Sequence, residues 1–191
     1  NLGGSVGDDP AARELLANSA GVATRRLAFF RIAFGSGAGA GGEATLPEAR
    51  ELAQGFIESG KAALDWPGDL LDQPSGALDP SVVKVLLCLV LIASEALPRG
   101  GDIGVNFADL EDGLGVAVVV AGERPSLGDD IRHALELEGE LEAELDGLTA
   151  RNVHGFYAQS LARGMGSRIE FSEASSGGIQ FAVLFPKTTI C

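Results

Sequence analysis

The sequence has few basic residues, and this shortage excludes whole classes of partner. Its 191 residues include 14 lysines and arginines against 27 aspartates and glutamates, so the formal net charge is -13. A chain with this charge repels phosphate backbones and anionic lipid headgroups. We therefore expect neither nucleic acid nor a membrane surface as a partner.

Cysteines and long apolar runs are also scarce. The two cysteines lie far apart, Cys88 inside an apolar stretch and Cys191 at the end, so we expect neither a disulfide framework nor a metal cluster. The longest apolar stretch, Val82 to Ala93, is interrupted by Lys84 and falls short of the roughly 20 residues that cross a bilayer. The start of the chain shows no signal-peptide pattern. Together these features favour a cytoplasmic location.

The first part of the chain predicts one long helix with an apolar seam. Asp8 or Asp9 can cap this helix, Pro10 suits its first turn and Gly35 ends it. Apolar residues recur along it at spacings of four and three, the pattern of a helical bundle. These residues are Leu16, Ala20, Ala23, Leu27, Phe30 and Phe34. A single helix cannot bury such a seam, so we expect a partner helix.

A glycine-rich stretch divides the chain. Residues 37–44 are expected to form a flexible linker between a bundle helix within residues 1–36 and an α/β domain over residues 45–191.

The α/β domain is expected to hold alternating helices and strands. Thr45 and Glu48 predict a capping box for a helix that runs to about Gly60. Asp79 and Pro80 predict the start of a buried helix. The full expected order is helix 45–60, strand 61–66, helix 79–97, strands 102–107 and 113–122, helix 127–137 continuing into the acidic run 138–147, helix 149–163, and a hairpin of 167–171 with 178–185. This order predicts an α+β fold, in which helices cover one face of a mixed sheet.

One segment resembles a nucleotide-binding element. Residues 86–105, LLCLVLIASEALPRGGDIGV, resemble the asparagine-bearing helix of the histidine kinase ATPase fold. In that register, the two asparagine positions of the family fall on Cys88 and Ile92. The second asparagine of the family offers an oxygen ligand to Mg²⁺, and Ile92 has no oxygen in its side chain.

The two other nucleotide elements of that fold are altered as well. Ala121 stands near the position of the aspartate that accepts the adenine amine in the family. The segment SLARGMGSRIEF, residues 160–171, aligns so that two glycines of the family's phosphate loop fall on Asn152 and His154. The resemblance therefore implies a degenerate ATPase fold, with no ATP and no metal of its own.

The helix before the linker narrows the resemblance. The segment RRLAFFRIAFG, residues 25–35, together with LDWP at 64–67 and ARNVHGFYAQSLARGMGSRI at 150–169, resembles the ChpT-type histidine phosphotransferases of alphaproteobacteria. This family implies a helical hairpin that forms a four-helix bundle in a homodimer, followed by a degenerate ATPase-type α/β sandwich. It also implies a phosphorelay shuttle, in which a histidine takes a phosphoryl group from one receiver-domain aspartate and passes it to another. The receiver supplies the Mg²⁺.

The family's acceptor histidine lies on a first bundle helix that has no counterpart in this sequence. We therefore expect the acceptor N-terminal to Asn1. His133 follows Asp129 and Asp130, and we expect it to be a surface residue. His154 is expected to pack over the vacated nucleotide position.

The arginines on the bundle helix leave two interpretations open. Arg25, Arg26 and Arg31 can form a solvated helix face, or they can meet the acidic rim of a receiver domain. Leu16, Leu27, Phe30 and Phe34 are expected in the bundle core or the dimer seam.

Two other functions compete with the shuttle. A dimeric adaptor that binds receivers or a kinase without accepting phosphate remains an alternative. An ATP-dependent kinase is disfavoured by Ile92, Ala121 and Asn152.

Overall fold

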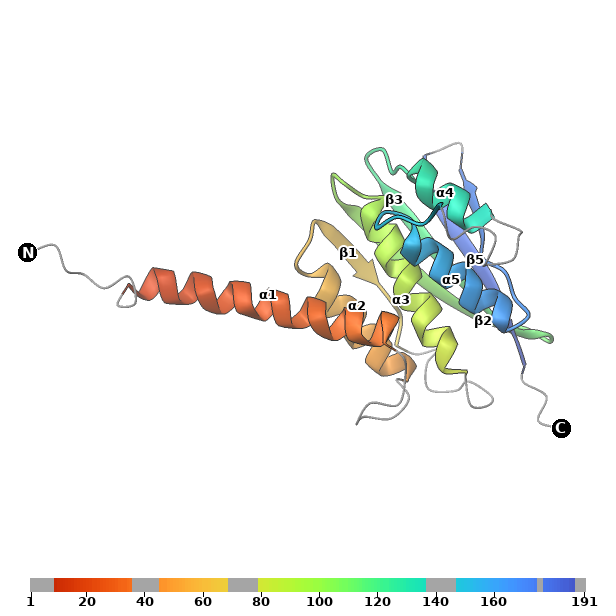
Figure 1. Ribbon diagram of the computed structural model, residues 1–191, viewed down its shortest axis with the longest axis horizontal. Coiled ribbons are helices and arrows are strands. Elements are labelled where there is room, and N and C mark those ends of the chain that lie inside the picture. The colour runs from red at the N-terminus through yellow and green to blue at the C-terminus, as the bar shows by residue number, and fades with distance from the viewer. Residues whose placement is uncertain (1–8, 36–44, 69–78, 137–146, 175–176, 188–191) are drawn as a thin grey trace, which may run out of the picture.

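A computed structural model describes residues 9–35, 45–68, 79–136, 147–174 and 177–187. A long helix, α1 (Pro10–Phe34), projects from a domain in which further helices pack against a sheet (Figure 1). Along the chain, the elements after α1 are α2 (Leu46–Ile57), β1 (Ala62–Asp65), α3 (Pro80–Glu95), β2 (Gly101–Asp109), β3 (Gly113–Gly122), α4 (Asp129–Glu136), α5 (Val153–Gly164), β4 (Glu170–Glu173) and β5 (Ile179–Pro186). This order confirms the predicted α+β fold.

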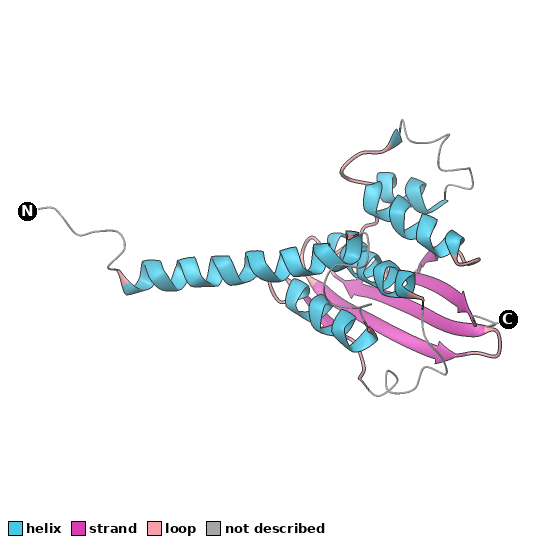
Figure 2. Ribbon diagram, turned by 60° about the horizontal axis from the view of Figure 1, so that its bottom comes forward, coloured by secondary structure: helices cyan, strands magenta, loops and turns pink. Residues whose placement is uncertain are grey.

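The five strands form one mixed sheet in the order β1-β2-β3-β5-β4. The β1 and β2 strands run parallel, and the other neighbours are antiparallel. Burial alternates along β5, where Phe181 and Val183 face the interior while Gln180 and Leu184 are exposed. This alternation places the helices on one face of the sheet, as predicted, and Figure 2 shows that arrangement.

The predicted helix starts are confirmed by their caps. The Asp9 carboxylate accepts from the backbone N–H of Ala11, and the Asp79 carboxylate accepts from Ser81. Thr45 and Glu48 form the complete capping box at the start of α2.

Helix α3 forms the centre of the core. Nearly all of its residues between Val82 and Ala93 are buried, and Lys84 is half-buried. Such a helix is apolar on most faces because it contacts α1 and α2 as well as α5 and the sheet.

Among the expected helix bounds, the start of α5 shifts most, and the expected extension of α4 lies outside the described residues. Helix α5 begins at Val153 instead of residue 149, because the side chain of Asn152 bonds back to Thr149 and Gly147 and holds these residues in a loop. Helix α4 is described to Glu136. The predicted continuation into the acidic run lies almost wholly within residues 137–146, outside the described residues.

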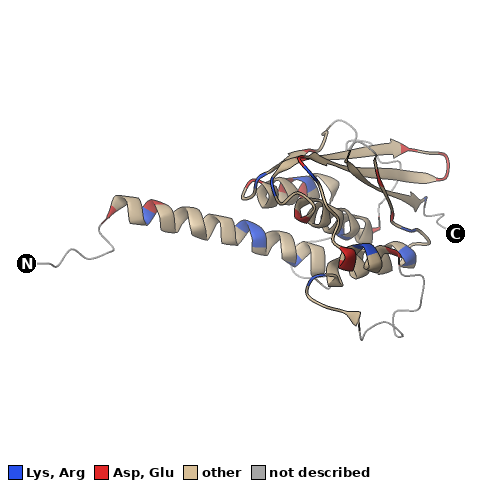
Figure 3. Cartoon of the chain, turned by 90° about the horizontal axis from the view of Figure 1, so that it is seen from above, with Lys and Arg blue, Asp and Glu red and all other residues tan. Residues whose placement is uncertain are grey.

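Helix α1 meets the domain through its C-terminal half only. Phe29 and Ala33 have no exposed surface, whereas the residues from Glu14 to Ala20 are all exposed. Figure 3 shows basic positions along this projecting helix. No helix in the described part of the chain is long and apolar enough to span a bilayer.

Candidate functional site

The two positions on α3 that the sequence resemblance aligns with asparagines of the kinase fold are buried by the surrounding protein. Cys88 is 0% exposed and Ile92 is 1% exposed. Burial raises the pKa of the Cys88 thiol to about 12, against an opposite effect of the Lys84 charge. A ligand-binding side chain has to reach its ligand, and neither of these side chains reaches the surface.

A histidine and a glutamate connect the start of α5 to the end of α3. The Nε2 atom of His154, near the start of α5, lies 3.0 Å from Oε2 of Glu95, the last residue of α3. The His154 side chain is 6% exposed and that of Glu95 is 52% exposed. The structure therefore buries His154 in the packing of α5 on α3, which agrees with its predicted packing role.

The loop before α5 uses its polar groups internally. The side-chain oxygen of Asn152 accepts from the backbone N–H of Thr149 at 2.7 Å, and its amide nitrogen donates to the carbonyl of Gly147 at 3.0 Å. Ala121, which the sequence resemblance places near the aspartate position of the kinase fold, lies near the end of β3 and has only a methyl group as its side chain. Among the described residues, no group of three or more His, Cys, Asp or Glu side chains is arranged to hold a metal ion.

The predicted seam of α1 splits into two parts. Leu16 is 68% exposed and Leu27 is 70% exposed, so the α/β domain covers neither. Phe30 and Phe34 also keep exposed surface but contact the domain. The ring of Phe30 lies 5.8 Å from that of Phe56 on α2, and the ring of Phe34 lies 5.6 Å from that of Tyr157 on α5.

The three arginines of α1 have different surroundings. The Nε of Arg25 donates to the carbonyl of Gly55 at 3.2 Å. The Nε of Arg26 donates to the hydroxyl of Ser59 at 3.4 Å, and its guanidinium lies 6.0 Å from the centre of the Phe56 ring. These contacts of Arg25 and Arg26 hold α1 against α2 and the residues that follow it. Arg31 is exposed in the last turn of α1.

Two polar residues with structural roles were not predicted. The Nζ of Lys84 donates to the carbonyl of Gly35, at the end of α1, at 2.7 Å. Gln159 of α5 donates to the carbonyl of Ile169 and accepts from its backbone N–H. The sequence signal for Lys84 is a single cation inside an otherwise apolar helix.

His133 is exposed on α4, as predicted.

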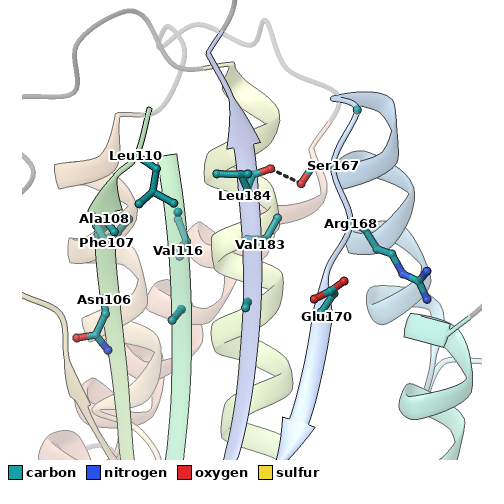
Figure 4. A pocket seen from close by; sticks show the side chains of 14 residues that line it. Asn106, Phe107, Ala108, Leu110, Val116, Ser167, Arg168, Glu170, Val183 and Leu184 are labelled. Carbon is teal, nitrogen blue, oxygen red and sulfur yellow. Dashed lines mark hydrogen bonds between the residues drawn. The ribbon is translucent and has the colours of Figure 1, made fainter. Parts of the chain in front are cut away.

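A shallow groove of about 670 Å³ lies on the face of the sheet opposite the helices (Figure 4). Small and apolar side chains of β2, β3 and β5 form much of its floor, and Ser167 donates from its hydroxyl to the carbonyl of Leu184 at one side. Arg168 and Glu170 also line it. Helix α3, which carries the buried Cys88 and Ile92, packs on the other face of this sheet.

Comparisons with known proteins agree with this architecture. A family model described as "Histidine phosphotransferase C-terminal domain" matches residues 46–177. The protein phosphotransferase ChpT of Brucella abortus (strain 2308) is 29% identical over 163 residues, which cover 85% of this chain and 74% of that protein.

Solved structures give the same result for the fold. A bacterial phosphotransferase solved at 1.7 Å is 26% identical and superposes with a TM-score of 0.72, covering 94% of this chain and 80% of that one. The nucleotide-free catalytic domain of the histidine kinase ThkA superposes with a TM-score of 0.55 at 18% identity, covering 74% of this chain and 88% of that one. The kinase likeness concerns the fold alone. Since the family model spans most of the chain, this protein belongs to the histidine phosphotransferase family of the ChpT type.

Proposed function

We propose that this protein is a histidine phosphotransferase of a two-component phosphorelay, which moves a phosphoryl group between the aspartates of receiver domains. The acceptor is a histidine on a helix that precedes Asn1 in the complete protein and pairs with α1. The observation that carries the proposal is a contrast. The bundle seam at Leu16 and Leu27 is left open for a partner, while Cys88 and Ile92 at the nucleotide position are closed.

The reaction requires a neutral and accessible imidazole. Its unprotonated nitrogen attacks phosphorus, so a nitrogen–phosphorus bond forms while the bond to the aspartate oxygen breaks and the carboxylate leaves. Alignment and the receiver's own Mg²⁺ supply most of the rate enhancement. We propose that the protein itself contributes no cofactor.

Neither histidine of this chain fits the acceptor role. His154 is 5% exposed and lies against Glu95. His133 is exposed, but Asp129 and Asp130 precede it on the same short helix, and their charge repels an incoming aspartyl phosphate. These two observations support a location of the acceptor outside residues 1–191.

We propose that ATP is not a substrate. The burial of Cys88 and Ile92 beneath the surrounding helices supports this, because a triphosphate at that position would have to displace packed protein. The phosphoryl group would arrive already activated on the receiver aspartate, so no nucleotide is required.

We propose a homodimer in the cytoplasm, with receiver domains as partners. Arg31 is the best placed of the three arginines for a receiver's acidic rim, because Arg25 and Arg26 already contact α2. The exposed parts of Phe30 and Phe34 adjoin it on the same helix.

The test is incubation of the full-length protein with a receiver that carries a radiolabelled phosphoryl group on its aspartate. We expect acid-labile label on the protein, and we expect its loss when the first-helix histidine is changed to glutamine. His133→Gln is the matched control and should accept label as the wild type does. If the wild type binds the receiver but takes no label, the shuttle is excluded and the adaptor function is favoured.

A further inference from the structure

A single cation interrupts the most buried helix of the protein. Lys84 is the one charged residue of α3 before Glu95, and its neighbours Val82, Val83 and Val85 are all buried. Placing an ammonium group among apolar side chains is unfavourable unless a partner compensates for the lost hydration. The identity of that partner therefore indicates what the lysine does.

The partner is the C-terminal end of α1. The Nζ of Lys84 donates to the carbonyl oxygen of Gly35 at 2.7 Å, and Gly35 is the residue that caps α1 by donating its own N–H to Arg31. The last carbonyls of a helix carry partial negative charge and lack partners within the helix, so a cation there is favourable. This bond joins two elements that are 49 residues apart in the sequence.

The capping geometry depends on glycine. A Cβ atom at position 35 would lie 2.1 Å from the carbonyl oxygen of Arg31, a distance that real Cβ atoms do not show. The absence of a side chain therefore lets the chain turn at the end of α1 with its carbonyl facing Lys84.

Arg25 and Arg26 bond the middle of α1 to α2 and the residues that follow it, but the other contacts in the last two turns of α1 are less directional. The ring of Phe29 stacks on that of Phe56 at 4.2 Å, and Phe34 lies beside Tyr157. Aromatic contacts of this kind hold α1 near the domain but permit a helix to roll or tilt with little loss of buried area. A charged hydrogen bond to one carbonyl has a narrower range of distance and angle.

We propose that Lys84 is a positioning residue, which locks the end of α1 to α3 through the Gly35 carbonyl and so fixes the direction in which α1 leaves the α/β domain. The effect of Lys84 on activity rests on the proposed function. A receiver that contacts both α1 and the domain meets them at one set angle, and the aspartyl phosphate is aligned with the histidine of the bundle.

The direct test measures the direction of α1 and needs no phosphoryl group. Spin labels are placed on the full-length protein at Leu15→Cys, 69% exposed on α1, and at Glu123→Cys, beyond the end of β3, in a Cys191→Ser background. Labelled chain is diluted with unlabelled chain so that only distances within one copy contribute. The width of the distance distribution is then recorded by double electron–electron resonance.

We expect one narrow distribution for the wild type. We expect at least about a twofold broader distribution for Lys84→Met, which keeps the length of the side chain but cannot donate to the Gly35 carbonyl. Lys84→Arg retains a cationic donor and should stay narrow. Lys61→Met is the matched control, because Lys61 is an exposed lysine on the turn before β1 and should leave the distribution unchanged.

A Lys84→Met distribution that is as narrow as that of the wild type, with the same mean distance, overturns the proposal. Circular dichroism confirms that the domain is folded in each variant. Lys84→Gln, which is polar but too short to reach the carbonyl, provides a second broadened variant if Lys84→Met does not fold.

Phosphoryl transfer is measured on the same variants as a separate readout. We expect the rate at low receiver concentration to fall at least about tenfold in Lys84→Met and to recover in Lys84→Arg. A wild type with a narrow distribution but no transfer would refute the proposed function and leave the positioning role intact. Normal transfer with a broadened distribution would overturn the claimed effect of position on catalysis.

Discussion

Cys88 aligns by sequence resemblance with an asparagine of the kinase fold, and its burial has a chemical consequence. Burial raises the pKa of this thiol to about 12, and the thiolate is the species that reacts with disulfide reagents. In a Cys191→Ser background, we expect the thiol to react with Ellman's reagent at least about a hundredfold more slowly in the folded protein than in urea. The absorbance of released thionitrobenzoate gives both rates. Rapid labelling of the folded protein would show that this part of α3 opens to solvent.

Asparagine at positions 88 and 92 should lower the stability of the protein without creating a nucleotide-binding site. We expect Cys88→Asn and Ile92→Asn each to lower the free energy of unfolding by about 1–3 kcal/mol, because each buries an amide without a partner. The pair Cys88→Ala and Ile92→Val keeps both positions apolar and controls for the change of size. Thermal unfolding measures stability, and titration calorimetry with ATP and Mg²⁺ measures binding. Micromolar ATP affinity in the double asparagine variant would contradict the claim that burial of these positions excludes a nucleotide.

Residue identity alone says which side chains carry no oxygen, as at Cys88, Ile92 and Ala121, since that is a property of each side chain. It did not predict the partners of Arg25, Arg26 or Lys84. Those partners lie 30, 33 and 49 residues away, and only tertiary packing brings them within bonding distance.

At the scale of one element, the stability that the capping box contributes at the start of α2 depends on pH, and the sign of this dependence is defined. The backbone N–H and the hydroxyl of Thr45 both donate to the Glu48 carboxylate, and the backbone bond is the larger cause of its lowered pKa. A lowered folded-state pKa means that the contribution to stability is complete above the ordinary value of 4.5 and disappears as pH falls through the folded-state value.

We therefore expect Glu48→Ala to lower the melting temperature at neutral pH, and the difference from wild type to shrink as the pH falls below 4.5. Glu51→Ala, at an exposed position on the same helix, controls for removal of a charge outside the capping box. Melting curves collected across the acidic range give the comparison. A difference that stays constant down to the lowest pH would exclude the ionised carboxylate as the stabilising species.

Most elements could be predicted because their signals are local: caps at Asp9, Thr45 and Asp79, and alternation along the strands. The start of α5 could not, because the bonds of Asn152 to Thr149 and Gly147 compete with helix formation. The buried face of α1 was also missed. Its C-terminal half carries two apolar faces, and the bundle periodicity identified the outer one while Phe29 and Ala33 enter the domain.

At the scale of the whole molecule, α1 acts as an arm whose base is fixed and whose outer half has no cover. The base is held by Phe29, Ala33, the Arg25 and Arg26 bonds to α2 and the residues that follow it, and the Lys84 bond. Exposed leucines lie on the outer half, at Leu15 and Leu16, and also at Leu27 nearer the base. An exposed helix of this kind gains most of its stability from packing against another helix. The proposed four-helix bundle of a dimer provides that packing.

This proposal makes a prediction that separates two adjacent leucines. Leu16 lies in the predicted seam and Leu15 does not, although they are 68% and 69% exposed. Leu16→Asp combined with Leu27→Asp should raise the dimer dissociation constant of the full-length protein at least about a hundredfold, since burial of each leucine contributes about 1.5–3 kcal/mol. Leu15→Asp should leave it nearly unchanged. Analytical ultracentrifugation measures the constants, and thermal unfolding of the domain should agree among the variants because none of these residues enters its core. Equal weakening by Leu15→Asp would show that charge on the arm, and not the seam, controls association.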